Sequence, residues 1–294
     1  MKIDVSIIIV NYKTPVLLKN CITSIFDKTE GVNFEIIVVD NNSNDGSETL
    51  INDNFPSVTY LQSGSNLGFG KANNMGIKIA RGRNIFLLNS DTILLNNAIK
   101  ILSDYLDENS NVGVCGGNLF DERLKNIHSF SPRFPGVYTE LDGILSGRLS
   151  KLKQNKTLHY NTLNYPIQVA YICGADMMVK ASVLEKVGVF DPDFFLYFEE
   201  TELSFRIREQ GYDLFNVPQA KIIHLEGASQ TTSKSKLTFY NTSRKKYYRK
   251  RYDLFKFFIV SWLFRLKCLI GLLKNTLVFD LPKIKMWYYN LMTF

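Results

Sequence analysis

The sequence predicts an α/β fold in which a mostly parallel sheet carries helices on both faces. Continuous apolar and β-branched runs alternate with stretches of helical periodicity through the first half of the chain. Strands that are apolar along their whole length are typical of parallel sheets whose two faces are both buried. The first half is therefore expected to form a Rossmann-like α/β sandwich.

Each element of this fold has its own local signal. Five short apolar runs predict strands at 5–10, 35–40, 58–62, 84–89 and 112–116. Pro15 suits the first turn of the first connecting helix, and Gly82 suits the end of the third. Beyond a polar, Gly/Ser/Lys-rich segment of expected loops and short helices at 121–166, further elements are predicted at 169–179, 180–188, 201–211, 213–217 and 221–225.

The charge is concentrated at one end of the chain. The whole chain carries +7, but residues 244–294 hold twelve Lys and Arg against Asp253 and Asp280, a balance of +10. The preceding residues are slightly acidic, which argues against a nucleic-acid-binding body and predicts an anionic partner for the tail. A chain of 294 residues is near the limit for one core. We expect a main domain at 1–235 and a basic, amphipathic helical tail at 236–294.

The cysteines and the start of the chain indicate the cell compartment. Cys21, Cys115, Cys173 and Cys268 form no CxxC pair and have no regular spacing, which favours reduced thiols over disulfides or a zinc site. The apolar run after Asp4 is too short for a signal peptide and fits a first strand. A cytoplasmic location is expected.

Polar side chains follow the first four predicted strands, where open parallel sheets bind ligands. They include Asn11, Asp40 and Asp91. Asp40 has the chemistry to accept a hydrogen bond from a base or ribose, but taken alone it is better explained as a turn residue. A dinucleotide site is excluded because no glycine follows the first strand. The NSD at 89–91 suits a divalent cation bridging two phosphates, although so short a motif occurs in many turns.

Five stretches, taken in order, resemble inverting family 2 glycosyltransferases of GT-A fold, especially their bacterial rhamnosyltransferase-like members. They are VSIIIVNYKTPVLLKNCITSI, EIIVVDNNSNDGS, NLGFGKANNMGI, FLLNSDT and GVFDPDFFLYFEETELSFRIREQGY. The resemblance implies a GT-A catalytic domain that moves a sugar from dTDP-rhamnose or a UDP-sugar to a hydroxyl group. The implied acceptor is a glycan, or a glycan linked to undecaprenyl, in surface polysaccharide synthesis.

The resemblance also implies the residues of the site. Those that would hold the nucleoside are Val10, Asn11, Tyr12 and Asp40, with Asn42 and Ser43 nearby. Those that would line the rest of the donor cleft are Asn66, Gly68, Phe69, Ala72, Asn73, Asn89, Ser90 and Asp91. Asp91 would bind Mg²⁺ or Mn²⁺, with His224 as a second ligand. Asn89 replaces the first acid of the family's D-x-D motif, so the cation would have one carboxylate fewer.

Three acids at 199, 200 and 202 compete for the role of catalytic base. The family's base aligns with Glu200. With a helix that begins at Thr201, Glu202 lies in the first turn and pairs with Arg206, so it needs no catalytic role. Glu199 and Glu200 would precede that helix in extended chain and point in opposite directions. We therefore expect Glu200 to face the cleft.

The tail is apolar enough to suggest a membrane span, but Arg265 and Lys267 interrupt it. Lys256, Lys267 and Lys274 are spaced to share one helical face. This pattern predicts a helix lying on an anionic membrane surface, near a lipid-linked acceptor. The alternative is a helical extension packed on the main domain or on the partner of a homodimer.

Two other functions stay open on the sequence. A GT-A nucleotidyltransferase would also bind nucleotide at these strand ends, although the glycine-rich and basic loop expected after the first strand is absent. A non-catalytic nucleotide-sugar-binding protein would fit the weakened NSD motif. Transfer or hydrolysis of a donor separates the second alternative from an enzyme.

Overall fold

A computed structural model describes residues 2–152, 159–225 and 233–294. Contacts divide the chain into two units. The first unit comprises residues 1–132, 159–192 and 199–230, and the second comprises 133–158, 193–198 and 231–294. The second unit thus contains two inserted segments besides the C-terminal residues. The domain boundary predicted after residue 235 stays a prediction.

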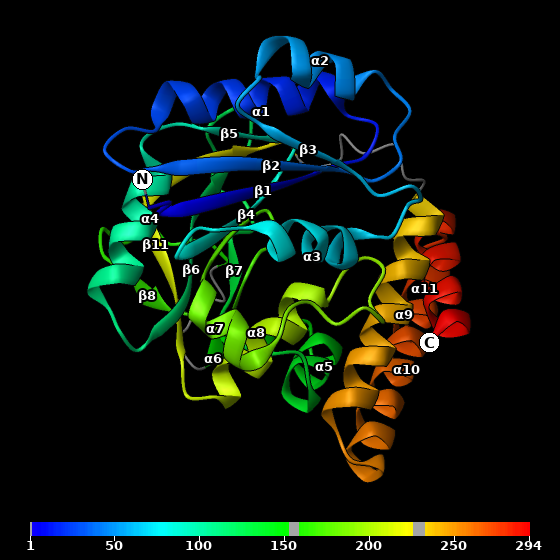
Figure 1. Cartoon of the computed structure of the whole chain (residues 1–294). Coiled ribbons are helices and arrows are strands. Elements are labelled where there is room, and N and C mark those ends of the chain that lie inside the picture. The colour runs from blue at the N-terminus through cyan, green and yellow to red at the C-terminus, as the bar shows by residue number, and fades with distance from the viewer. Residues whose placement is uncertain (1, 153–158, 226–232) are drawn as a thin grey trace. The chain divides into compact units, whose positions relative to one another are not determined.

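The first unit is built on a mixed sheet with the strand order β3-β2-β1-β4-β10-β6-β11-β5 (Figure 1). Its parallel half consists of β3 (Thr59–Gln62), β2 (Phe34–Asp40), β1 (Val5–Asn11) and β4 (Asn84–Asn89). Antiparallel β10 (Asp176–Lys180) then separates β4 from β6 (Val112–Phe120). The sequence did not indicate this reversal, because a buried strand has the same apolar pattern in either direction.

The far half of the sheet is organised by one long strand. β11 (Asp213–His224) runs parallel to β6 and antiparallel to β5 (Thr92–Leu94) and β8 (Ile167–Gln168). A register shift between Asn216 and Lys221 bends it, so the two predicted strands are two halves of one. The bend brings its C-terminal end, His224, beside Thr92. A separate two-stranded ladder joins β7 (Phe130–Ser131) to β9 (Tyr171–Ile172).

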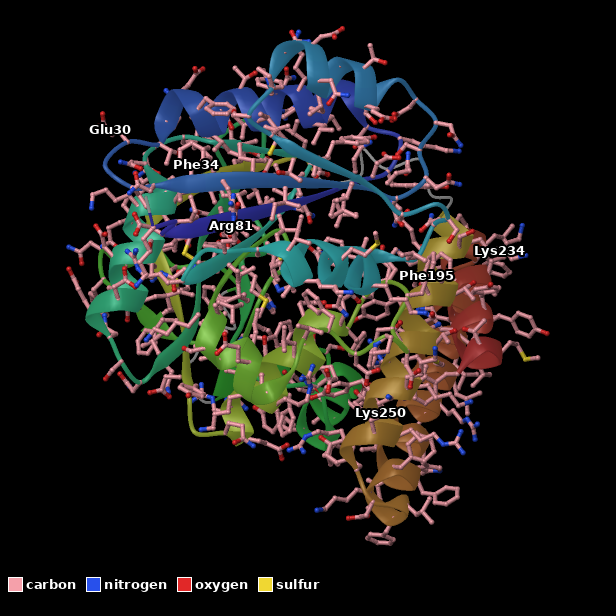
Figure 2. All side chains as sticks on the ribbon, in the orientation of Figure 1. Glu30, Phe34, Arg81, Phe195, Lys234 and Lys250 are labelled. Carbon is pink, nitrogen blue, oxygen red and sulfur yellow. The ribbon has the colours of Figure 1, made fainter. Side chains whose placement is uncertain are left out.

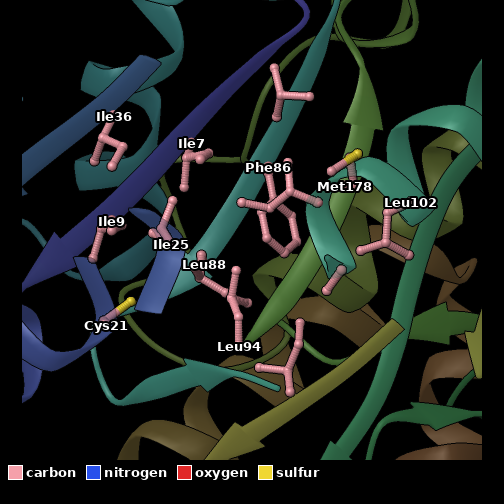
Figure 3. Close-up of a cluster of buried hydrophobic side chains, with 14 of the residues drawn as sticks. Ile7, Ile9, Cys21, Ile25, Ile36, Phe86, Leu88, Leu94, Leu102 and Met178 are labelled. Carbon is pink, nitrogen blue, oxygen red and sulfur yellow. The ribbon is translucent and has the colours of Figure 1, made fainter. Parts of the chain in front are cut away.

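Helices bury both faces of the sheet, as the alternation along β1 requires. Ile7 and Ile9 point into a cluster with α1 (Pro15–Lys28) and α4 (Ala98–Glu108), part of which is drawn in Figure 3. Ile8 points to the other face, towards the cluster that includes α3 (Phe69–Ile79), α7 (Ala181–Val187) and α8 (Glu199–Glu209). Gly76 allows α3 to approach closely, because a Cβ there would lie 2.5 Å from Cγ2 of Ile8. The remaining helix, α2 (Ser47–Asn54), follows β2.

The second unit is helical in the part that the structure describes. It contains α5 (Val137–Ile144), α6 (Arg148–Leu152), α9 (Ser233–Arg251), α10 (Leu254–Leu277) and α11 (Leu281–Thr293). α9, α10 and α11 pack against one another. In Figure 2, Phe195 lies beside α9, whose ends are marked by Lys234 and Lys250, and its ring is 4.9 Å from that of Phe239. Among the described helices, none has the length and apolarity needed to cross a bilayer.

A buried ion cluster holds α5, α9 and α10 together. Glu140 accepts hydrogen bonds from Tyr248 at 2.7 Å and from Lys267 at 2.5 Å, and Arg244 lies 3.7 Å away. Lys256, Lys267 and Lys274, which the sequence placed on one helical face, therefore differ in their surroundings, because Lys256 and Lys274 are exposed. The helical spacing is as predicted, but Lys267 lies where α5 packs on α10 and points at a carboxylate.

Candidate active site

A buried network joins the ends of β1 and β2. The amide of Asn11 donates to Oδ1 of Asp40 at 2.8 Å and to the hydroxyls of Ser43 and Ser47 at 3.2 and 3.1 Å. The other oxygen of Asp40 accepts the backbone N–H of Ser43 at 2.9 Å. Asp40 therefore shapes the loop after β2, in which Asn42 has a left-handed backbone with φ of 63°. Val10 and Asn42 are half-buried, and Tyr12 is more exposed.

The glycine-containing loop before α3 is tied to the same strand end by Asn41. Its amide nitrogen donates to Oδ1 of Asn66 at 3.0 Å and to the carbonyl of Gly68 at 3.3 Å, and its oxygen accepts the N–H of Leu67 at 2.8 Å. Gly68 adopts φ of 83°, which a side chain would disfavour. Asn41 was not singled out in the sequence. Its position in the asparagine pair after Asp40 was the available signal.

Two predicted cleft residues turn inwards instead. Ala72 is fully buried in the core cluster that contains Ile8. Asn73 is buried and donates to the carbonyl of Phe69 within α3 at 3.1 Å. Phe69, at the start of this helix, is half-buried and lies edge-on to Phe190. These contacts give Ala72 and Asn73 packing roles in the helix that carries Phe69.

The NSD turn after β4 meets the end of β11. Oδ1 of Asp91 lies 3.3 Å from Nε2 of His224, and the amide nitrogen of Asn89 also lies 3.3 Å from that Nε2. The backbone N–H of Leu225 donates to the carbonyl of Asp91 at 2.9 Å and fixes the two segments together. The end of β11 thus brings His224 beside Asn89 and Asp91, so that three predicted residues from two distant parts of the chain meet.

Hydrogen bonds connect this turn to the Asp40 network. Ser90 lies 3.0 Å from the hydroxyl of Thr14, which donates to Oδ1 of Asn11 at 2.9 Å. The amide of Asn11 in turn binds Asp40. Thr14 was not predicted, and nothing but its place just after the first strand distinguished it. One continuous polar row runs from the predicted nucleoside residues to the predicted metal residues.

The chemistry of the NSD turn fits a divalent cation. Oδ1 of Asn89 and Nδ1 of His224 are buried polar atoms with no hydrogen-bond partner among the described residues. Asp91 adds a carboxylate that is only 16% exposed. No cluster of three His, Cys, Asp or Glu occurs in the described residues. Cations that retain water and bind substrate phosphates need only one or two carboxylates from the protein, so this smaller set is adequate.

The three acids lie in the first turn of α8, which begins at Glu199 rather than Thr201. The expectation that Glu199 and Glu200 precede the helix is wrong, yet neighbouring helical residues still diverge by about 100°. Cβ of Glu199 lies against Gly70, 3.6 Å from where a Cβ on that glycine would stand. Cγ of Glu200 lies 3.8 Å from the corresponding point on Gly174. The two carboxylates therefore leave the helix towards different neighbours.

Their contacts separate the roles of Glu200 and Glu202. Glu202 binds Nε of Arg206 at 2.8 Å, as expected for an i,i+4 pair, and Arg206 also donates to the carbonyls of Val187 and Val189. Burial raises the pKa of Glu200 above its ordinary value, and a 3.3 Å hydrogen bond from Thr201 partly offsets this rise. A carboxylate with a raised pKa is a better proton acceptor.

Comparisons with known proteins define the class. The family model for glycosyl transferase family 2 matches residues 6–188. The Haloferax volcanii low-salt glycan biosynthesis hexosyltransferase Agl10 is 27% identical over 248 residues, covering 83% of this chain and 74% of that protein. The Shigella flexneri dTDP-rhamnosyl transferase RfbF is 25% identical over 230 residues, covering 77% of this chain and 71% of that protein. This chain belongs to glycosyl transferase family 2 and is a rhamnosyltransferase-like glycosyltransferase.

A solved structure confirms the fold. The crystal structure of GalNAc-T7 with UDP, GalNAc and Mn²⁺ matches with a TM-score of 0.60 at 17% identity. The match covers 82% of this chain and 47% of that one. The GT-A-like α/β architecture predicted from the sequence is therefore correct. The family match, rather than this fold, removes the basis for the nucleotidyltransferase and non-catalytic alternatives. The family match ends before Glu200 and His224, so their roles rest on geometry.

Proposed function

We propose that this glycosyltransferase inverts the anomeric carbon as it moves a sugar from a nucleoside-diphosphate sugar to an acceptor hydroxyl. The observation that carries the donor assignment is the polar row from Asp40 through Asn11, Thr14 and Ser90, which ends at the Asp91–His224 pair. A nucleoside diphosphate has the matching order of groups, with a polar nucleoside at one end and a metal-binding diphosphate at the other. The name of the relative RfbF supports dTDP-rhamnose as the donor, and a UDP-sugar is the alternative.

Glu200 acts as the base in this proposal. Its carboxylate takes the proton of the acceptor hydroxyl while the acceptor oxygen forms a bond to the anomeric carbon. The bond from that carbon to the diphosphate breaks on the opposite face, and the diphosphate leaves with the bonding electrons. One displacement of this kind inverts the configuration. The raised pKa of Glu200 suits the role, because the group must hold the proton it receives.

Asp91 and His224 hold the cation in this proposal, with Oδ1 of Asn89 as a third ligand. When bound, Mg²⁺ or Mn²⁺ supplies positive charge that stabilises the departing diphosphate. Asp40 and Asn11 keep the nucleoside loop in shape, while Tyr12 and Asn42 are accessible enough to contact the nucleoside. Gly174, which lies beside Phe69 and Glu200, borders the acceptor side in this proposal.

The acceptor in this proposal is a glycan, or a glycan on a polyprenyl carrier, and the reaction belongs to surface polysaccharide synthesis. The relative Agl10 is named for glycan biosynthesis, which supports this direction. The basic C-terminal helices support a peripheral position on the inner face of the cell membrane, where a lipid-linked acceptor is within reach.

Calorimetric titration with dTDP, UDP and GDP, with and without Mn²⁺, tests the donor site. The proposal predicts that one nucleotide binds and that Mn²⁺ strengthens its binding. Tight binding of dTDP alone would support rhamnose as the transferred sugar. A folded protein that binds none of the three nucleotides under either condition would contradict the donor assignment.

A further inference from the structure

The outward side of α10 is apolar along its length. It presents large side chains that recur every three, four or seven positions, namely Phe255, Phe258, Trp262, Leu269, Leu273 and Leu277. All are exposed, with Phe255 at 75% and Trp262 at 62%. We call this set the outer face of α10. The opposite side of the helix, which includes Phe264, Cys268 and Gly271, is already buried within the second unit.

The turn between α10 and α11 extends this surface. Val278, Phe279 and Leu281 are 70%, 85% and 64% exposed. Phe279 has a left-handed backbone, with φ of 53°, because it closes the C-terminal turn of α10. Its N–H donates to the carbonyl of Thr276, and the N–H of Asp280 donates to the carbonyl of Asn275. Extended apolar surface of this kind marks an interaction site.

The helices that carry this surface are firmly joined. Gly271 lets the ring of Trp287 lie against α10, since a Cβ at this glycine would stand 2.4 Å from the ring. The rings of Phe264 and Phe294 are 4.3 Å apart, and Asn241 donates to Asn290 at 2.8 Å. These contacts occupy the inner sides of the helices. They leave the outer face of α10 available to an external partner.

The charge around the surface is positive. Arg265, Lys274 and Lys285 are exposed and have no acidic partner in the part of the chain that the structure describes. The two acids of this segment are engaged elsewhere, because Asp253 and Asp280 accept backbone N–H groups at the starts of α10 and α11. A second copy of the chain would bring like charges together at this rim. An anionic lipid surface would satisfy both the apolar side chains and the cations.

We infer that the outer face of α10 and the adjoining turn insert into the head-group region of an anionic bilayer. The inference rests on the membrane position proposed above and identifies the surface that makes contact. It differs from the pattern expected from sequence, in which Lys267 belonged to the lipid-facing charge. The apolar face enters the membrane, and Arg265, Lys274 and Lys285 meet lipid phosphates at its edge.

Trp262 provides a direct test, because the chain has two tryptophans and Trp287 packs on Gly271. In the Trp287→Phe protein, we expect the emission of Trp262 to shift to the blue with phosphatidylglycerol-containing vesicles and to be quenched by brominated lipid. In Trp262→Phe, which retains Trp287, neither change is expected. A blue shift that depends on protein concentration without vesicles would show that a second copy covers the face, and would overturn the inference.

Flotation measures the contribution of the face to binding. The double variant Phe258→Ser/Trp262→Ser should lower partitioning onto phosphatidylglycerol-containing vesicles by about tenfold or more. The matched control Val16→Ser/Leu124→Ser replaces exposed apolar residues of the first unit and should leave it unchanged. Arg265→Glu/Lys274→Glu should also weaken binding, whereas Lys78→Glu should not.

Nucleotide binding by the same variants separates this inference from the proposed function. The expected result is normal nucleotide affinity with lost flotation. The membrane surface would be overturned if Phe258→Ser/Trp262→Ser floated normally, or if the unmodified protein did not float. Either result would count regardless of how the proteins bind nucleotide. If the unmodified protein bound no nucleotide but still floated with the vesicles, the donor site would be contradicted and the membrane surface would stand.

Discussion

The imidazole Nε2 of His224 lies 3.3 Å from Oδ1 of Asp91. The pair forms because β11 bends after Asn216 and then runs alongside β5, just beyond the NSD turn. A histidine at a strand end is ordinary in sequence. Beside Asp91 and the unpaired Oδ1 of Asn89, it becomes part of a site with the chemistry of a cation ligand set.

Substitution of either member of this pair should remove the effect of metal on nucleotide binding. We expect Asp91→Asn and His224→Ala each to weaken Mn²⁺-dependent nucleotide binding by about tenfold or more, because each removes a ligand. Calorimetry with and without Mn²⁺ gives the comparison. His128→Ala, which changes a histidine elsewhere in the first unit, should keep the full metal effect. Equal Mn²⁺ dependence in all three variants would rule out the pair as the metal site.

The Asp40 network should contribute to folding as well as to binding. Asn11→Ala removes four hydrogen bonds from a buried site and leaves a buried carboxylate with fewer donors. We expect the free energy of unfolding to fall by about 2–4 kcal/mol. Urea denaturation measures the loss. Asn20→Ala, at an exposed position of α1, should change the free energy of unfolding by no more than about 0.5 kcal/mol. If both variants lost the same free energy of unfolding, the Asp40 network would make no special contribution to stability.

Asp176 should make stability depend on pH. Burial raises its pKa well above the ordinary value, and a hydrogen bond from the N–H of Gly117 only partly offsets this. The folded state therefore favours the protonated form. That contribution to stability is complete below the unfolded pKa and is lost as the pH rises through the folded pKa.

Asp176→Asn imitates the neutral acid and tests this sign. We expect the variant to be more stable than the unmodified protein at neutral pH and to lose less stability as the pH is raised. Urea denaturation across mildly acidic to neutral pH measures both effects. Asp53→Asn, at an exposed position, should leave the pH profile unchanged. A variant that is less stable at neutral pH would show that Asp176 is charged in the fold.

The sequence predicted the fold correctly where the local pattern of apolar residues matches the burial that the structure gives them. Largely apolar strands such as Val5–Asn11 are buried on both sides. The polar residues at the strand ends do meet at one edge, where Asn11 binds Asp40 and is linked through Thr14 to Ser90. The direction of β10 could not be read from its residues, because pairing partners decide it. Thr14 and Asn41 were overlooked for a related reason. A single hydroxyl or amide acquires a role only when its distant partner is known.

The boundary of α8 and the environment of Lys267 show the same limit. Helix capping signals allow an uncertainty of one or two residues, and here the helix includes Glu199 and Glu200. The spacing of Lys267 is correct for a shared face with Lys256. Its surroundings depend on Glu140, which lies in an inserted segment of weak periodicity. Packing between segments far apart in sequence was not predictable from either one.

The rate of sugar transfer by the Glu200→Gln variant tests most directly the central claim that Glu200 is the catalytic base. With dTDP-rhamnose or the nucleotide sugar that calorimetry selects, turnover should fall by about 10²–10⁴-fold while nucleotide affinity is preserved. Glu202→Gln, which alters the neighbouring Arg206 pair, should lose stability but little turnover. The unmodified enzyme should also lose activity on acidification at a higher pH than an ordinary glutamate would give, since the pKa of Glu200 is raised. Full turnover by a folded Glu200→Gln protein would contradict the assignment of the base.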